Sequence, residues 1–470
     1  MNEKKVLALY DFASKQEFIY RTSKIKEISG ASEMLSGIYG ELVSYLNNLE
    51  DGVKINSYDP DTEVDSFNLN AFETSILDAQ VLYEGGGNLM VLYKNKTAYI
   101  KANRLMSVYL LEKCPTLSMI ACCVPFESNF DANRKALYKE NAIAKKRRPS
   151  AYISGVTPFT MVDPLTFFPV TYRKSYPEQS LSADRAAKQA CYKKKSTDNL
   201  EGLEGLAAVI YIDGNSMGDK LKKCSSEDYD EGVRKLRTFS KQVNDAFVVK
   251  PLKAIEEILG DNSKGYRRVI GGGDEITIIC EAKDAWNVVK KYFEVLSVQE
   301  LSLIGCKCTS CAGISVFHAK APFDTAYQIA QAACESAKRH SRSCEDENNN
   351  NYIDFHYCHS GITNDFKTLR ETEQKHATGR PYHFDDIKSM FDYMTPILQA
   401  ADRSNVKALG NAAQKGFTDY LLEVERVNAY LAGGVAKLNC SEQEMKLVYD
   451  MAEFYDIWFA KDGECNEETT

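Results

Sequence analysis

Two adjacent acidic residues interrupt an apolar stretch of the sequence, RRVIGGGDEITIIC, which runs from Arg267 to Cys280. Asp274 and Glu275 follow three glycines, and the segments on either side have the composition of β-strands. A hairpin turn needs one or two glycines, but it gains nothing from a pair of like charges. Taken alone, the segment is explained most simply as a surface turn with solvated acids.

A third acid gives the pair a chemical meaning. Asp213 ends the apolar run GLAAVIYID, which has the pattern of a buried strand. If this strand lies beside the hairpin, three carboxylates converge and repel one another unless a cation binds among them, and hard oxygen ligands suit Mg²⁺ or Mn²⁺. Such ions can activate a ribose hydroxyl and stabilise the pyrophosphate that leaves after in-line attack on an α-phosphate. The pattern therefore predicts metal-dependent nucleotidyl transfer with Asp213, Asp274 and Glu275 as catalytic residues.

A basic helix end supplies opposite charge. Lys338 and Arg342 are four residues apart in ESAKRHSR and share one face of a predicted helix, which suits the binding of a triphosphate. The simpler alternative is that the two cations complement the helix dipole. Gly272 and Gly273 before the acids would let a nucleotide approach the backbone closely.

The elements that must position these residues occur twice. From residue 205 the pattern is a strand, helices, the glycine hairpin, a helix, the strand CTSCAGISVF and a long helix. The first half has the same order, from KKVLALYDF through QVLYEGGGNLMVLY and LSMIACCVPF to a helix that begins near Phe130. This matched order indicates duplication of a β-α-β-β-α-β unit, the ferredoxin-like pattern of polymerase palms and nucleotide cyclases.

The first repeat lacks the acids of the second. Its last helix aligns with that of the second repeat without a gap, so that Lys145 matches Lys338. It keeps Asp11, but its hairpin reads Gly-Gly-Gly-Asn-Leu, with Asn88 and Leu89 aligned to the two acids. We therefore expect this copy to be catalytically inactive and still able to bind a second nucleotide, through Gly86, Gly87, Asn88 and Lys145.

Composition excludes several classes of protein. The 470 residues carry a net charge of −8, so any site for a polyanion must be local, and no segment is long and apolar enough to be a membrane span or secretory signal. The 14 cysteines are irregularly spaced, which favours the reducing cytoplasm. The one C-x-x-C, from Cys308 to Cys311, lies in a predicted strand and favours buried thiols over zinc.

The expected fold class is α+β, with two ferredoxin-like palm domains in a pseudo-twofold arrangement and a helical C-terminal domain. The predicted boundaries are 1–148 for the first, degenerate palm, 149–205 for a connector with short helices, 206–360 for the second, catalytic palm and 361–470 for the helical domain.

Several of these segments resemble a known family. The motifs YIDGNSMGD, GGGDE, CAGISVFHAKAPFDTAY and ESAKRHSR are similar to the palm of the large polymerase-cyclase subunit of type III CRISPR effector complexes, and more distantly to GGDEF-class diguanylate cyclases. The N-terminal QEFIYRTSKIKEISGASEML resembles the start of the first palm of that subunit. The resemblance covers most of residues 1–360.

The resemblance implies ATP as the substrate, cyclic oligoadenylate as the product, and other effector subunits and guide or target RNA as partners. Asp213, Asp274 and Glu275 would hold Mg²⁺ or Mn²⁺ together with the Gly214 carbonyl. Nucleotide binding would fall to the residues that match the family's motifs: Gly214, Asn215, Ser216, Gly272, Gly273, Lys338 and Arg342.

The sequence departs from the family pattern in places. Glu275 replaces a usual aspartate and Asn215 an acid, and neither a His-Asp nuclease motif nor paired C-x-x-C motifs are present. The form expected is therefore one that lacks the HD nuclease domain. The alternatives are a free-standing cyclic nucleotide synthase of antiphage signalling, a diguanylate-type cyclase that uses GTP, and a scaffold subunit with vestigial cyclase activity.

Overall fold

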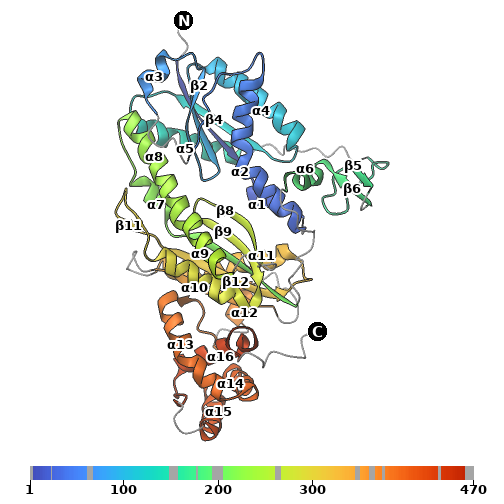
Figure 1. Cartoon of the computed structure of the whole chain (residues 1–470), viewed down its shortest axis with the longest axis vertical. Helices are drawn as coiled ribbons and strands as arrows, with labels where there is room; N and C mark the ends of the chain where they lie inside the picture. Colours follow the sequence, from blue (N-terminus) through green and yellow to red (C-terminus); the bar gives the residue numbers. More distant parts are fainter. Residues whose placement is uncertain are drawn as a thin grey trace. The chain divides into compact units, whose positions relative to one another are not determined.

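The computed structural model describes residues 4–22, 24–60, 67–147, 157–175, 178–192, 205–259, 266–343, 350–358, 366–372, 376–431 and 436–460. The chain divides into two compact units (Figure 1). The first unit consists of Met1–Asn199, Ser216–Asp245 and Leu301–Cys306, and the second unit of Leu200–Asn215, Ala246–Glu300 and Lys307–Thr470. The Lys193–Lys195 run, most of the acidic asparagine loop after Glu345 and the C-terminal tail lie outside the described residues.

The first unit contains a four-stranded antiparallel sheet in the order β2-β3-β1-β4. Its strands are β1 (Val6–Phe12), β2 (Ala79–Gly85), β3 (Asn88–Tyr93) and β4 (Met119–Pro125). Every residue of β1 is buried, as expected for an apolar strand in the middle of a covered sheet. Its helices are α1 (Lys15–Ile19), α2 (Ile25–Asn48), α3 (Leu69–Thr74), α4 (Lys96–Lys113) and α5 (Phe130–Lys146).

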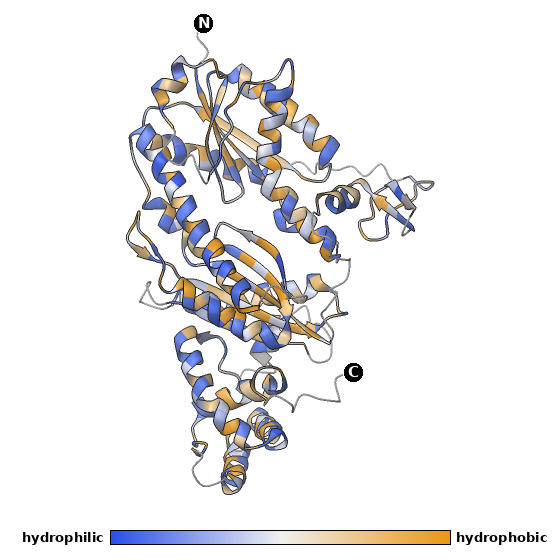
Figure 2. Ribbon diagram, in the orientation of Figure 1, coloured by the Kyte–Doolittle hydropathy of each residue, from blue (hydrophilic) through white to orange (hydrophobic). Residues whose placement is uncertain are grey.

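The second unit contains a six-stranded sheet in the order β14-β13-β12-β7-β9-β8. Its strands are β7 (Leu206–Gly214), β8 (Arg267–Gly272), β9 (Glu275–Glu281), β12 (Ser310–His318), β13 (Tyr352–Tyr357) and β14 (Tyr382–His383). Figure 2 shows that the central strands are strongly apolar, whereas the helices alternate between apolar and polar faces. The helices of this repeat are α9 (Lys250–Leu259), α10 (Ala285–Leu296) and α11 (Phe323–Ser341).

The duplication predicted from the sequence is visible in the strand order. In each sheet the first strand of the repeat lies between the second hairpin strand and the last strand, which gives β2-β3-β1-β4 and β8-β9-β7-β12. The long last helix packs on the sheet in both repeats, as α5 on β4 and β1 and as α11 on β12 and β7. The expected β-α-β-β-α-β order is therefore confirmed in both halves.

One helix of the second repeat belongs to the core of the first unit. After α7 (Met217–Lys222), α8 (Tyr229–Asn244) contributes Tyr229, Val233 and Leu236 to the apolar cluster beneath β2 and β3. The buried Arg237 donates hydrogen bonds to the carbonyls of Leu82 at 2.7 Å and Val81 at 3.1 Å, where β2 departs from regular register. The predicted 206–360 boundary thus differs from the observed units at residues 216–245, because this amphipathic helix buries its apolar face in the first core.

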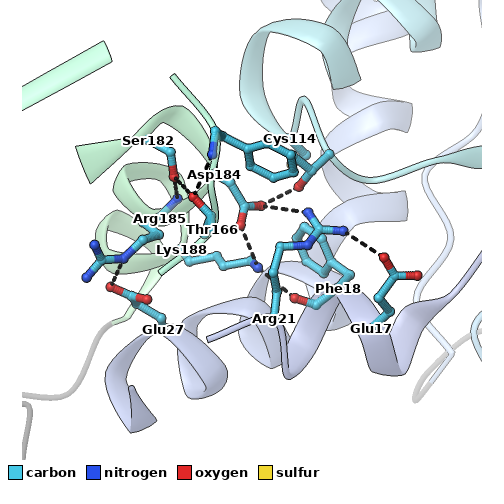
Figure 3. Close-up of polar contacts among 12 residues, drawn as sticks. Glu17, Phe18, Arg21, Glu27, Cys114, Thr166, Ser182, Asp184, Arg185 and Lys188 are labelled. Atoms are coloured by element: carbon cyan, nitrogen blue, oxygen red, sulfur yellow. Dashed lines mark hydrogen bonds and ion pairs between the residues drawn. The ribbon is translucent and has the colours of Figure 1, made fainter. Parts of the chain in front are cut away.

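The predicted connector folds as a small hairpin with a helix, formed by β5 (Val170–Ser175), β6 (Glu178–Ser182) and α6 (Ala183–Cys191). A buried ion pair attaches α6 to α2, and a buried hydrogen bond attaches it to α1 (Figure 3). Lys188 pairs with Asp184 at 2.9 Å and donates to the Phe18 carbonyl, and Arg185 pairs with Glu27 at 2.8 Å. Burial lowers the pKa of Lys188, so its charge depends on these partners.

We expect Asp184→Ala to destabilise the first unit strongly. Asp184 accepts hydrogen bonds from Lys188 and Thr116, and its removal leaves the buried ammonium without its counter-charge, which costs about 3–5 kcal/mol in comparable pairs. Urea unfolding of the whole chain should show an earlier first transition. The matched control is Asp51→Ala, which removes an exposed partner of Lys101 and should change stability little. Equal midpoints for the two variants would contradict the prediction.

The segment after β13 is mainly helical, as predicted. It contains α12 (Phe366–Thr372), α13 (Phe384–Ala400), α14 (Arg403–Lys415), α15 (Phe417–Tyr430) and α16 (Glu442–Glu453). A fully buried Arg380 pairs with Asp450 at 2.9 Å and Glu453 at 2.7 Å. None of the described helices is long and apolar enough to cross a membrane. Cys308, just before β12, and Cys311, within β12, are both buried, as predicted for this pair of cysteines.

Candidate active site in the second unit

The sheet register of the second unit brings the three acids together. Asp213, near the end of β7, is the direct cross-strand partner of Glu275, the first residue of β9. Asp274 lies in the turn before β9, and its carbonyl accepts a hydrogen bond of 3.1 Å from the Gly214 amide. Directly opposed side chains in an antiparallel pair are close neighbours on one face, so the predicted convergence of carboxylates is present.

The hairpin turn explains why an acid can stand at its tip. The turn between β8 and β9 consists of Gly273 and Asp274, and only Gly273 has a positive φ, of 66°. A two-residue turn of this kind requires glycine at its first central position and leaves the second open to another residue. A Cβ added at Gly272 or Gly273 would meet no atom within 4 Å, so the space beside the strand end is open.

The electrostatics of the three acids favour a bound cation. Burial, followed by the charges of Asp213 and Asp274, raises the pKa of Glu275 to about 7. The Oε1 atom of Glu275 is buried and has no hydrogen-bond partner in the structure. A buried, unpaired carboxylate oxygen beside two further carboxylates carries a free-energy cost that a positive charge would offset.

Lys338 supplies positive charge from the last helix of the repeat. Its ammonium lies 2.5 Å from Asp213 Oδ2 and donates a hydrogen bond of 3.1 Å to the Gly214 carbonyl. Lys338 is 18% exposed, so its remaining N–H groups can reach a ligand. Arg342 is the C-terminal cap of α11 and is exposed. Of the two predicted cations, Lys338 is the one that the structure places on the acids.

Two predicted nucleotide-binding residues have contrasting surroundings. Asn215 is buried, and its side-chain amide donates to the Asn350 carbonyl at 3.0 Å while its Oδ1 accepts from Cys311 at 3.3 Å. These contacts give Asn215 a structural role in joining β7 to the strand ends beside it. Ser216 is exposed and adopts a left-handed conformation with φ of 55° directly before α7.

The donor set fits a hard divalent ion. Asp213, Asp274 and Glu275 provide carboxylate oxygens and Gly214 a backbone carbonyl, which are the ligands preferred by Mg²⁺ and Mn²⁺. Among the described residues no group of three or more His, Cys, Asp or Glu side chains forms a preformed metal cluster. The Lys338 ammonium contacts both Asp213 and the Gly214 carbonyl, so an ion would have to displace it from them.

The matching position in the first unit is built around Asp11. Its Oδ2 lies 2.5 Å from Lys145 on α5, as Asp213 does from Lys338 on α11, so the predicted equivalence of the two lysines holds in the structure. Asp11 is 2% exposed, and neighbouring lysine ammonium groups hold its pKa below the usual value although burial alone would raise it.

The hairpin alignment of the two repeats needs a correction of one residue. In the first unit the two-residue turn is Gly86-Gly87, and Asn88 is the cross-strand partner of Asp11. Gly87 therefore stands where the second unit has Asp274, and Asn88 stands where it has Glu275. Both turn glycines have positive φ, of 56° and 71°, a backbone conformation that favours glycine at each position. The alignment of Asn88 and Leu89 with the acids was wrong, because a run of three glycines fits either register.

Sequence reasoning missed two residues of the first unit that contact Asp11. Lys15 lies 2.8 Å from its Oδ1, and the Asn141 amide donates to its Oδ2 at 3.3 Å. For Asn141 the spacing was a usable signal, because it lies four residues before Lys145 on the same helix, α5. Side chains four apart on a helix share a face.

A comparison with protein-family models finds a match within the second repeat. Residues 206–345 match the family model described as Cas10/Cmr2, second palm domain. No curated protein sequence matches the chain significantly.

Solved structures of Csm1 resemble the whole chain. A Csm1–Csm4 cassette in complex with pppApApA has a TM-score of 0.60 at 15% identity, covering 96% of this chain and 69% of that one. The cassette in complex with cA3 gives 0.55 at 15% identity, with coverage of 96% and 70%. Csm1 from T. onnurineus gives 0.58 at 12% identity, with coverage of 97% and 69%. Residues 206–345 therefore match the second palm domain of the Cas10/Cmr2 family, and the chain as a whole has a Csm1-like fold.

Proposed function

We propose that the chain is a metal-dependent nucleotidyltransferase that joins and cyclises ATP into cyclic oligoadenylates as a subunit of a type III CRISPR complex. The observation that carries the proposal is the cluster of Asp213, Asp274 and Glu275 at the strand ends of the second palm, with Lys338 against it. Similar Csm1–Csm4 cassettes were solved in complex with a linear and a cyclic adenylate, pppApApA and cA3.

The acids and Lys338 of the second palm have distinct roles in this proposal. Asp213, Asp274, Glu275 and the Gly214 carbonyl would hold Mg²⁺ or Mn²⁺, which activates the attacking ribose hydroxyl and stabilises the leaving pyrophosphate when bound. Lys338 would exchange its contact with Asp213 for one with the triphosphate, so that a positive charge is present with and without nucleotide.

The remaining predicted residues would position the nucleotide. Open space beside Gly272 and Gly273 lets the substrate approach the backbone. Exposed Arg342 would add a second phosphate contact, and exposed Ser216 a hydroxyl. The acids would hold the metal ion, which would supply the charge stabilisation that phosphoryl-group chemistry requires.

The partners are part of the proposal. The similar structures were solved as Csm1–Csm4 subcomplexes, which supports assembly of this chain with other effector subunits. Guide or target RNA is the further partner in the proposal. A free-standing synthase would give the same products without partners. A scaffold with vestigial activity would give none, and the retained acids argue against it because an inactive palm has no use for repelling carboxylates.

Mass spectrometry of reaction products tests the proposal. The purified chain is incubated with ATP or GTP and Mn²⁺, alone and with effector subunits and target RNA. We expect cyclic oligoadenylates from ATP. Products from GTP alone would favour the diguanylate type, and the absence of any oligonucleotide in all mixtures would refute synthesis and leave the scaffold role.

A further inference from the structure

A lysine of the first unit occupies a position that carries no charge in the second. Lys15 is the first residue of α1 and follows Ser14, which has a left-handed φ of 49°. The second repeat has the same turn, with Ser216 at φ of 55° followed by Met217 at the start of α7. Lys15 and Met217 are each four residues after the strand aspartate, so they are equivalent in the two repeats.

The Lys15 ammonium bridges two oxygens. It lies 2.8 Å from Asp11 Oδ1 and donates a hydrogen bond of 2.8 Å to the Gly87 carbonyl. A carboxylate of the strand aspartate and an oxygen of the hairpin tip are the kinds of ligand that a divalent ion would join at the end of such a sheet. A Cβ at Gly87 would come within 2.2 Å of Lys15 Nζ, so the missing side chain makes this approach possible.

The charge at the two strand ends is opposite. The second unit gathers three carboxylates against one ammonium, from Asp213, Asp274, Glu275 and Lys338. The first unit gathers one carboxylate, Asp11, against the two ammonium groups of Lys15 and Lys145. An excess of positive charge binds an anion directly, whereas an excess of carboxylates needs a cation first.

The neighbourhood of Asp11 also contains unsatisfied polar atoms. Asn141 is 5% exposed, and its Oδ1 has no hydrogen-bond partner, as is true of Asn88 Oδ1 beside it in the hairpin. The oxygens of Asp11 are already used by Lys15, Lys145, Asn141 and the Phe12 amide. Lys15 and Lys145 remain 30% and 49% exposed, so both ammonium groups can add a ligand from solvent.

We propose that the first palm binds the phosphate groups of a nucleoside triphosphate without a divalent ion, because the ammonium of Lys15 serves as a built-in cation. The inference rests on the proposed function, in which a second nucleotide is already expected in the inactive repeat. It adds that Lys15 takes the place of a metal ion at that site. Asn88 and Asn141 then offer carbonyl acceptors to hydroxyl or amino groups of the same nucleotide.

The test measures ATP binding with the second palm disabled. In the full chain carrying Asp213→Asn and Asp274→Asn, equilibrium binding of ATP is measured with excess EDTA and with Mg²⁺. We expect the dissociation constant to differ by less than about threefold between the two conditions. Adding Lys15→Met, which installs the residue of the second repeat, should weaken binding in EDTA by about ten- to a hundredfold, the value of one charge-assisted contact. Lys15→Arg should retain most of the affinity.

Controls make the result decisive. Lys145→Met in the same background removes the other ammonium while Lys15 still neutralises Asp11, and it should weaken binding more mildly, because neighbouring basic residues partly replace it. Melting temperatures show that each variant is folded. The proposal is overturned if EDTA abolishes ATP binding to the background protein, or if Lys15→Met and Lys145→Met, both folded, bind ATP as tightly as the background does. Because the assay reads binding, its outcome is independent of whether the wild-type chain synthesises oligoadenylate.

Discussion

Asp274→Ala is expected to reduce oligonucleotide synthesis by on the order of 10³-fold, since it removes a ligand whose loss costs several kcal/mol of transition-state stabilisation. The melting temperature should stay the same or rise. Asp274 raises the pKa of Glu275 by repulsion, so its removal relieves repulsion among the acids of the apoprotein. The measurements are initial rates with saturating ATP and Mn²⁺ and a thermal melt of each protein.

Asn88→Ala is the matched control for Asp274→Ala. Asn88 lies at the hairpin of the first unit and carries no charge, and its removal leaves the acids of the second palm intact. We expect synthesis to remain within about tenfold of wild type, because at most one neutral hydrogen bond to a nucleotide is lost. If Asn88→Ala were as inactive as Asp274→Ala, catalysis would not belong to the second palm alone. Near-wild-type rates for Asp274→Ala would refute the metal assignment.

Lys338→Ala is expected to raise the apparent KM for ATP by about ten- to a hundredfold, because a charge-assisted contact with phosphate is lost. Arg342→Ala should act in the same direction. Lys145→Ala should have a milder effect, because neighbouring basic residues of the first unit partly replace it. ATP titration of the three variants, with and without RNA, measures these differences. A wild-type KM for Lys338→Ala would show that the phosphate contact is misplaced.

A second measurement on Lys338→Ala separates a phosphate contact from a purely structural role. Without Lys338, Asp213 loses its ion-pair partner of the apoprotein. Mn²⁺ should therefore raise the melting temperature of Lys338→Ala more than that of wild type, since the ion then binds without displacing an ammonium. Equal shifts in both proteins would contradict the assignment of Lys338 as the resident counter-charge.

The sequence predicted the pairing of Asp213 with Glu275 because the apolar pattern of the strands and the glycine turn restrict the strand register. An apolar strand that ends at Asp213 and a hairpin that starts a strand at Glu275 leave few ways to arrange the two carboxylates. Lys338 followed from the basic helix end ESAKRHSR, and Lys145 followed from the gapless match between the last helices of the repeats. The contact of Lys338 with Asp213 could not be predicted, because a flexible side chain chooses among several partners only once the fold exists.

Two features of the first unit were not predictable from residue types. The three glycines allow either turn register, and only the backbone conformation shows that Gly86 and Gly87 form the turn. Lys15 lies outside every sequence motif. Its role becomes visible only in the structure, where it contacts the hairpin tip at the Gly87 carbonyl. The amphipathic pattern of α8 predicted a helix, but the core that it covers depends on tertiary packing that periodicity does not encode.

The packing of α8 determines when the first unit can finish folding during synthesis on the ribosome. The sheet of the first unit and its last helix have been synthesised once α5 is complete. The apolar surface under β2 and β3 nevertheless stays exposed until Tyr229, Val233 and Leu236 have been made. At translation rates of about 5–20 residues per second, these residues follow roughly 5 to 20 s later. The N-terminal half therefore cannot finish folding before the first strand of the second palm, β7, has been made. A nascent chain halted at residue 199 would expose an unfilled core and offer chaperones a binding surface.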